Sequence, residues 1–173
     1  MELNPLTALS PIDGRYARQT DALRDIFSEC AFMNARVRVE VEWLISLSEA
    51  GFAELPHLSD HGKAFLRGLA DNFSLADCEA IKEIEKTTNH DVKAVEYWIK
   101  NQVAHDEELK SASEFVHFSC TSEDINNTSH AIMLKRGREA LADYLQQIHD
   151  TIAGFAHQSV SYTHLTLPTI CSV

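Results

Sequence analysis

The chain has 173 residues, 45% hydrophobic and 24% charged, and its 6 Gly and 4 Pro are too few for the many turns of a β-sandwich or barrel. Its 15 basic and 26 acidic residues leave a formal net charge of -11, which argues against non-specific binding to nucleic acid or anionic lipid, because both need an excess of Lys and Arg. No uncharged apolar run reaches the roughly 18 residues of a membrane span. The composition favours a helical globular protein that could still bind a small anion in one pocket.

The cysteines predict neither a metal site nor a disulfide framework. They are spaced 48, 42 and 51 residues apart, which fits no zinc-ligand or redox motif: Cys30, Cys78, Cys120 and Cys171. The N-terminal residues also lack the basic start and apolar core of a signal peptide. We therefore expect reduced thiols and a cytoplasmic location.

Helical patterns follow an irregular N-terminal segment of 19 residues. Apolar residues recur three and four positions apart, which predicts helices over about 21–49, 59–72, 75–85 and 92–103. Ser74, followed three positions later by Asp77, has the pattern of an N-cap with an acidic third position. Strand patterns are almost absent, so the sequence predicts an all-α fold.

A much longer helix is predicted from Glu123 to His157. Thr121 and Ser122 have the pattern of a helix cap, and acidic residues fill the first turn. Downstream, apolar residues form a heptad-like seam: Leu134, Leu141, Leu145, Ile148, Ile152 and Phe155. At roughly 1.5 Å per residue this helix would be about 50 Å long. The shorter helices cannot cover such a seam, so we expect long partner helices from other chains or from a continuation of this one.

The last 15 residues differ in composition from the rest. Residues 159–173 contain no Asp, Glu, Lys or Arg, and the helical period stops there. One interpretation is an ordinary apolar C-terminal strand or tail. We favour a non-native tail, such as a read-through or a cloning scar.

Two polar clusters before residue 92 are candidates for binding. Arg15 follows a glycine turn and could hold a phosphate or carboxylate through its planar guanidinium, with Tyr16 adding a hydroxyl or a stacking face. Asn89, His90 and Asp91 precede a predicted helix, where a His beside a carboxylate could bind an anion or move a proton. The alternative for Arg15 is a surface ion pair. For the second cluster it is that Asp91 only caps the helix and His90 is a solvated loop residue.

The third cluster has the clearest physical basis. Thr121 and Ser122 stand at the predicted start of the long helix, where unpaired N–H groups and the positive end of the helix dipole attract anions. Their hydroxyls would add two donors. The alternative is that both residues only cap the helix.

Three segments, in this order, carry a family resemblance: Ser10-Pro11-Ile12-Asp13-Gly14-Arg15-Tyr16, Lys86-Thr87-Thr88-Asn89-His90-Asp91-Val92-Lys93-Ala94-Val95-Glu96, and Phe115-Val116-His117-Phe118-Ser119-Cys120-Thr121-Ser122-Glu123-Asp124-Ile125-Asn126-Asn127. They resemble the adenylosuccinate lyase family in its bacterial form, over roughly residues 1–158. The last segment is similar to the first signature of the wider fumarase and argininosuccinase superfamily.

The resemblance implies a β-elimination that releases fumarate from adenylosuccinate and from the succinyl-carboxamide intermediate of purine biosynthesis. By resemblance, Arg15 and Tyr16 would hold the phosphate end of the nucleotide, such as AMP. Asn89, His90 and Asp91 would line the nucleotide pocket, and Thr121 and Ser122 would grip the succinyl or fumarate carboxylate. No cofactor or metal is implied.

The resemblance also implies a domain organisation and an assembly. Residues 1–110 are similar to the N-terminal helical domain of the family, and residues 111–158 to the start of its central helical bundle, with 159–173 as the non-native tail. Family members are homotetramers whose long helices pack together, which would account for the apolar seam.

Two departures from the family bear on activity. The segment that carries the family's proton-donating His is Thr-His-Gly-Gln, whereas here Leu165 follows Thr163 and His164, so that role is not transferred. The Ser-rich loop that supplies the base is absent from the 173 residues. We therefore assign no catalytic acid or base and expect the chain alone to be inactive.

Two other functions remain open from the sequence. An HD-type metal-dependent phosphohydrolase is also all-α, and its ligands could be His61, the His90-Asp91 pair and Asp124. A non-catalytic helical adaptor is the second alternative. Bound divalent metal would distinguish the first alternative from a lyase, and failure to bind AMP or fumarate in a full-length protein would favour the second.

Overall fold

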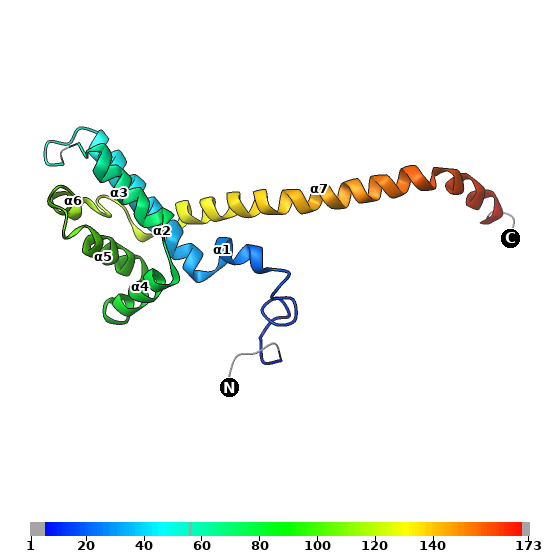
Figure 1. Ribbon diagram of the computed structural model, residues 1–173, viewed down its shortest axis with the longest axis horizontal. Coiled ribbons are helices and arrows are strands. Elements are labelled where there is room, and N and C mark those ends of the chain that lie inside the picture. The colour runs from blue at the N-terminus through cyan, green and yellow to red at the C-terminus, as the bar shows by residue number, and fades with distance from the viewer. Residues whose placement is uncertain (1–5, 56, 171–173) are drawn as a thin grey trace. The chain divides into compact units, whose positions relative to one another are not determined.

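The computed structural model describes residues 6–55 and 57–170, with side chains described as far as residue 159. Within these residues every regular element is a helix (Figure 1). In chain order the elements are η1 (Asp21–Leu23), α1 (Arg24–Phe27), α2 (Glu29–Glu49), α3 (Asp60–Asp71), α4 (Leu75–Thr88), α5 (Asp91–Val103), α6 (Glu107–Ala112), η2 (Ser113–Phe115) and α7 (Ser122–Ile170). The all-α prediction is confirmed.

Local capping residues explain most of the helix boundaries. Ser59 accepts a hydrogen bond from Gly62 N at 3.0 Å and begins α3, as predicted. Ser74 and Asp77 form the predicted capping box of α4, which continues to Thr88 rather than ending near residue 85. Such caps satisfy N–H groups that the first helical turn leaves unpaired.

The predicted helix over 21–49 is interrupted. Ser28 has an extended backbone, with ψ at 164°, and its hydroxyl accepts a hydrogen bond from Ala31 N at 3.1 Å. It therefore caps a new helix, α2, so the single-helix prediction was wrong. A serine in a helical pattern competes for backbone donors in this way without changing the apolar period.

The core of the first unit lies around α2. This helix packs against α3, α4 and α5, and α4 packs against α5. Fully or almost fully buried apolar side chains fill the space between these helices, among them Val37, Val41, Leu44, Leu66, Ile81, Val95 and Ile99. Burying each such side chain contributes about 1.5–3 kcal/mol. This packing makes α2 the scaffold on which the later helices are placed.

The structure divides into one unit that ends at Lys135 and a second that begins at Arg136, so α7 belongs to both. The predicted domain boundary near residue 110 stays a prediction. α7 begins one residue earlier than predicted and continues past His157 to Ile170. The apolar side chains of its predicted seam have exposed fractions of 46–65%: Leu134, Leu141, Leu145, Ile148, Ile152 and Phe155.

In the described part of the chain, no helix combines the length and apolar character needed to cross a membrane.

Cys30 and Cys78 form a disulfide between α2 and α4, with their Cα atoms 5.7 Å apart. The expectation that the thiols are all reduced was wrong for this pair. Sequence spacing failed to show it because the pairing arises from packing of two helices that are 48 residues apart in the chain. Cys120 is a free thiol, and Cys171 lies outside the described residues.

The disulfide is expected to stabilise the first unit. Replacing both cysteines (Cys30→Ser with Cys78→Ser) should lower the free energy of unfolding by about 2–4 kcal/mol, because the bond restricts a long loop in the unfolded chain. Urea denaturation under non-reducing conditions measures this, with Cys120→Ser as the matched control. Equal unfolding midpoints for the double variant and the unmodified chain would contradict the bond.

Candidate functional site

The structure brings two of the predicted clusters together. His90 lies at the start of α5 and Ser122 at the start of α7, and Ser122 Oγ is 3.4 Å from His90 Nε2. The Nδ1 atom of His90 accepts a hydrogen bond from Lys93 N at 3.2 Å, so the neutral imidazole carries its proton on Nε2 and donates it toward Ser122. The N-termini of two helices thus meet at one pair of side chains, which favours an anion at this point.

Asn89 and His90 are fixed by the corner between α4 and α5. Asn89 has a left-handed backbone, with φ at 50°, and ends α4. Asn is among the few non-glycine residues that adopt this conformation readily. His90 then caps α5, and Thr88 Oγ1 donates a hydrogen bond to the His90 carbonyl at 3.1 Å. The cap of α5 is thus His90 and not Asp91, the residue that the alternative interpretation took as the cap, and the second ring nitrogen of His90 is directed at Ser122.

A buried arginine from α2 connects the two clusters. Arg36 is only 5% exposed, and its guanidinium donates to Asp91 Oδ2 at 2.5 Å and to Asn126 Oδ1 at 2.9 Å. It also lies over the Phe32 ring, 3.9 Å from the centroid. Because planar guanidinium groups bond in fixed directions, Arg36 sets the distance between the starts of α5 and α7.

Asp91 is held as a carboxylate by these contacts. Partial burial by itself would raise the pKa of Asp91, but the Val92 N–H and the Arg36 guanidinium outweigh burial and lower this pKa below its ordinary value. The ionised Asp91 then neutralises Arg36. Asp91 therefore acts in the structure as the partner of Arg36.

Thr121 is used as a helix cap. Its N–H and its hydroxyl both donate to Asp124 Oδ2 at 2.8 Å. These bonds lower the pKa of Asp124 below its ordinary value. The hydroxyl of Thr121 is thus bonded within the first turn of α7, whereas that of Ser122 faces His90 at the start of α5.

Arg15 and Tyr16 lie apart from this group. Both are exposed in the turn-rich segment before η1, and the Arg15 guanidinium lies 4.6 Å from the centroid of the Tyr16 ring. Among the described residues, no hydrogen bond or ion pair joins them to His90 or Ser122. The structure therefore brings together His90, its neighbours and Ser122, but not the predicted phosphate-binding pair.

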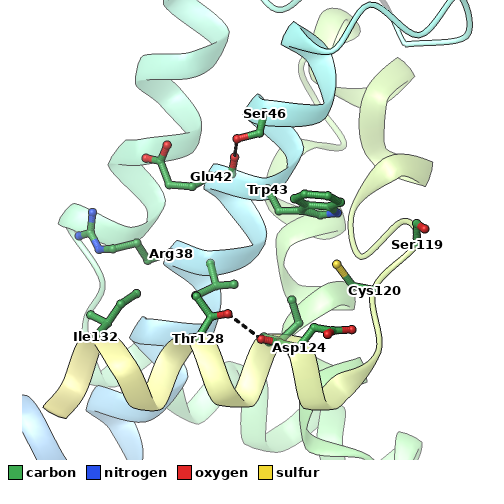
Figure 2. A pocket seen from close by; sticks show the side chains of 11 residues that line it. Arg38, Glu42, Trp43, Ser46, Ser119, Cys120, Asp124, Thr128 and Ile132 are labelled. Atoms are coloured by element: carbon green, nitrogen blue, oxygen red, sulfur yellow. Dashed lines mark hydrogen bonds between the residues drawn. The ribbon is translucent and has the colours of Figure 1, made fainter. Parts of the chain in front are cut away.

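A cavity of about 350 Å³ opens beside the His90 cluster, lined by Glu29, Phe32, Met33, Arg36, Ile81, Glu85, Asn89, His90 and Asp91. A second cavity, of about 560 Å³, lies between α2, the loop before α7 and the first turns of α7 (Figure 2). Trp43 and Cys120 lie on one side of it and Arg38 and Ile132 on the other. None of the residues predicted to bind the lyase substrate lines the second cavity, although Asp124, the partner of Thr121 and a ligand considered for the HD-type alternative, does.

Two buried charges on α2 were missed by sequence reasoning. Arg36 and Glu40 lie four residues apart, on the same face of the helix, and both are buried. Glu40 Oε1 lies 2.6 Å from His117 Nδ1, in the loop that leads to α7. Charged residues within an otherwise apolar helical face were the available signal, but sequence alone does not give their partners.

The described residues contain no group of three His, Cys, Asp or Glu side chains placed to share a metal ion. His61 lies on α3, whereas His90 and Asp124 lie at the starts of α5 and α7. The geometry therefore gives no support to the HD-type alternative.

Comparison with known proteins places the chain in a family. A family model described as a lyase matches residues 14–167. The chain belongs to this lyase family. This assignment agrees with the resemblance drawn from the three motifs, and it favours the lyase interpretation over the HD-type and adaptor alternatives.

Several curated members of the family are similar in sequence. Adenylosuccinate lyase of Vibrio cholerae is 50% identical over 168 residues, which cover 96% of this chain and 36% of that protein. Those of Haemophilus influenzae and Escherichia coli are 52% and 51% identical over 160 residues, 91% of this chain and 35% of each protein. The chain thus spans about a third of the length of the curated relatives it matches.

Proposed function

We propose that the chain forms the part of an adenylosuccinate lyase that binds the substrate, in an enzyme that eliminates fumarate from adenylosuccinate and from the succinyl-carboxamide intermediate of purine biosynthesis. The observation that carries the proposal is the meeting of His90 and Ser122 at two helix N-termini, with a 3.4 Å contact between them. Such a site suits a carboxylate, and the substrates carry two. Sequence identity of about half to curated adenylosuccinate lyases supports this chemistry.

The proposed roles follow the predicted ones, except that Thr121, predicted to grip the carboxylate together with Ser122, acts through its capping bonds. Ser122 donates to the succinyl carboxylate, where negative charge builds as the proton is removed. Asn89, His90 and Asp91 line the nucleotide pocket, with Asp91 acting through Arg36. Thr121 shapes the same helix start, and its backbone and capping bonds fix the position of Ser122. Arg15 and Tyr16 bind the phosphate in the assembled enzyme.

The proposed assembly is a homotetramer in which seams of α7 pack against one another. The support is the exposed apolar seam, since exposed side chains of this kind at heptad spacing pack against other helices.

The proposed location is the cytoplasm. The Cys30–Cys78 bond weighs against that location, because disulfides are rare there, so the localisation rests on the proposed reaction alone.

The experiment compares two proteins. The 173-residue chain alone is expected to release no fumarate from adenylosuccinate, because the family's acid and base segments are absent from its sequence. A chimera that joins residues 1–158 of this chain to the remaining two thirds of the Escherichia coli relative is expected to be active. Fumarate release is measured chromatographically, with host lyase removed by expression in a strain that lacks it.

The outcomes are distinct. An inactive, correctly assembled chimera would contradict the proposed function, since the Escherichia coli portion supplies the missing segments. Turnover by the 173-residue chain alone would instead overturn the expectation that those segments are required.

A further inference from the structure

Glu40 is a carboxylate in the centre of the core that the proposed function does not use. It lies on α2 and is fully buried. One of its oxygens lies 2.6 Å from His117 Nδ1, and the other, Oε2, is buried with no hydrogen-bond partner among the described residues. Burial raises the pKa of Glu40, and the contact with His117 offsets part of that increase. A buried carboxylate with one satisfied oxygen is costly, and its contact with His117 gives it a role that an apolar side chain cannot fill.

His117 lies in a loop with an unusual backbone. His117 and Ser119 both have left-handed conformations, with φ at 64° and 60°. Non-glycine residues rarely adopt this conformation, and it persists only where surrounding contacts enforce it. Cys120 N donates to the His117 carbonyl at 3.3 Å, which closes a turn immediately before Thr121 and Ser122.

α2 holds this loop at two successive residues. Glu40 contacts the ring of His117, and Trp43 Nε1 donates to the Phe118 carbonyl at 2.8 Å. The loop then enters α7 within four residues, so its conformation sets where α7 begins. The same helix holds the His90 side of the site, since Arg36 bonds to Asp91.

We propose that Glu40 and His117 are a positioning pair that fixes the start of α7, so that the Ser122 hydroxyl faces His90. Within the residues that the structure describes, no hydrogen bond or ion pair joins Glu40 or His117 to His90 or Ser122. Glu40 provides a directional hydrogen-bond acceptor in the core, and His117 transmits its position to the strained loop. The importance of Ser122 for catalysis rests on the proposed function, but the placement of Ser122 by this pair does not.

The placement is tested by nuclear magnetic resonance on the 173-residue chain with isotope-labelled histidine. The ring signals of His90, assigned by comparison with His90→Gln, report the contact with Ser122. His117→Ala is expected to move these signals to the position that Ser122→Ala gives, because the hydroxyl leaves the ring. His117→Asn should restore the original signals, since Asn accepts a positive φ and can donate to Glu40. His105→Ala, on an exposed loop, is the matched control.

The outcomes decide the proposal without substrate. Unchanged His90 signals in a folded His117→Ala protein would overturn it, and so would failure of His117→Asn to rescue them. If His117→Ala does not unfold cooperatively, Glu40→Met replaces it as the test variant, because Met has a similar volume and lacks the carboxylate acceptor, and it is likewise expected to move the His90 signals.

A kinetic arm separates this proposal from the proposed function. In the chimera, His117→Ala should lower kcat more than it raises KM, as expected when a group aligned only in the transition state is displaced. An inactive chimera would count against the lyase proposal, but the nuclear magnetic resonance test of the Ser122 position would still be valid. An active chimera with kcat unchanged by His117→Ala would overturn the catalytic importance of this placement, whereas the magnetic resonance experiment decides the placement itself.

Discussion

Ser122→Ala is expected to lower kcat of the chimera about 100- to 1,000-fold with a small effect on nucleotide affinity. Loss of one donor that stabilises developing charge costs about 2.7–4 kcal/mol in the transition state. Ser122 is the donor in question because its hydroxyl faces His90 at the N-terminus of α7. Steady-state kinetics with adenylosuccinate measure the effect, and Ser111→Ala, an exposed serine on α6, is the matched control.

Arg15→Ala in the same chimera should have the opposite signature. A phosphate contact made equally in the ground state and the transition state affects KM, with little change in kcat. Should Arg15→Ala reduce kcat alone while Ser122→Ala raises only KM, the two ends of the substrate would be assigned the wrong way round.

Self-association of the 173-residue chain through α7 is the second large effect. Each apolar seam side chain contributes about 1.5–3 kcal/mol when it is removed from water, and Leu145, Ile148 and Ile152 are all more than half exposed. We expect oligomers at micromolar concentration. Leu145→Lys combined with Ile152→Lys should shift the chain to monomer, because both substitutions place charge on the same helical face.

Analytical ultracentrifugation measures the effect, and Gln147→Lys is the control, since Gln147 is an exposed polar residue two positions along the helix from Leu145. An unmodified chain that stays monomeric throughout the micromolar range would rule out the seam as an interface. Equal association of Gln147→Lys and the double variant would show that net charge, rather than the seam, controls the oligomeric state.

Local sequence patterns predicted the helices well where a cap or a long period was present. Ser59, Ser74 and the Thr121 cluster each begin a helix, because a side-chain oxygen next to an apolar period satisfies backbone donors. α6 was missed because its six residues, Glu107–Ala112, are too few to show a period. The end of α7 was placed too early, because residues after His157 lose the seam without containing a helix breaker before Pro168.

The candidate site was predictable as separate clusters but not as an arrangement. Motifs identified His90 and Ser122, yet their contact depends on packing between helices that begin 31 residues apart. Arg36 and the Glu40–His117 pair were not predicted, because a charged residue in a helical pattern is ordinarily on the solvent side. The Cys30–Cys78 bond was missed for a different reason, because the spacing of cysteines in the sequence does not show which of them are close in the folded chain.

Arg36 also has an evolutionary consequence. It is buried and bonds to Asp91 on α5 and to Asn126 on α7, so two positions far apart in the sequence depend on one guanidinium. Asp91 is half exposed, but its loss would leave the buried Arg36 guanidinium without its counter-charge, which is costly, whereas concerted replacement of the partners can be nearly neutral. Effects of substitutions at these positions are therefore non-additive. In lineages that diverge at this site, positions 36, 91 and 126 are expected to change together, so that covariation among them records the geometry of the site.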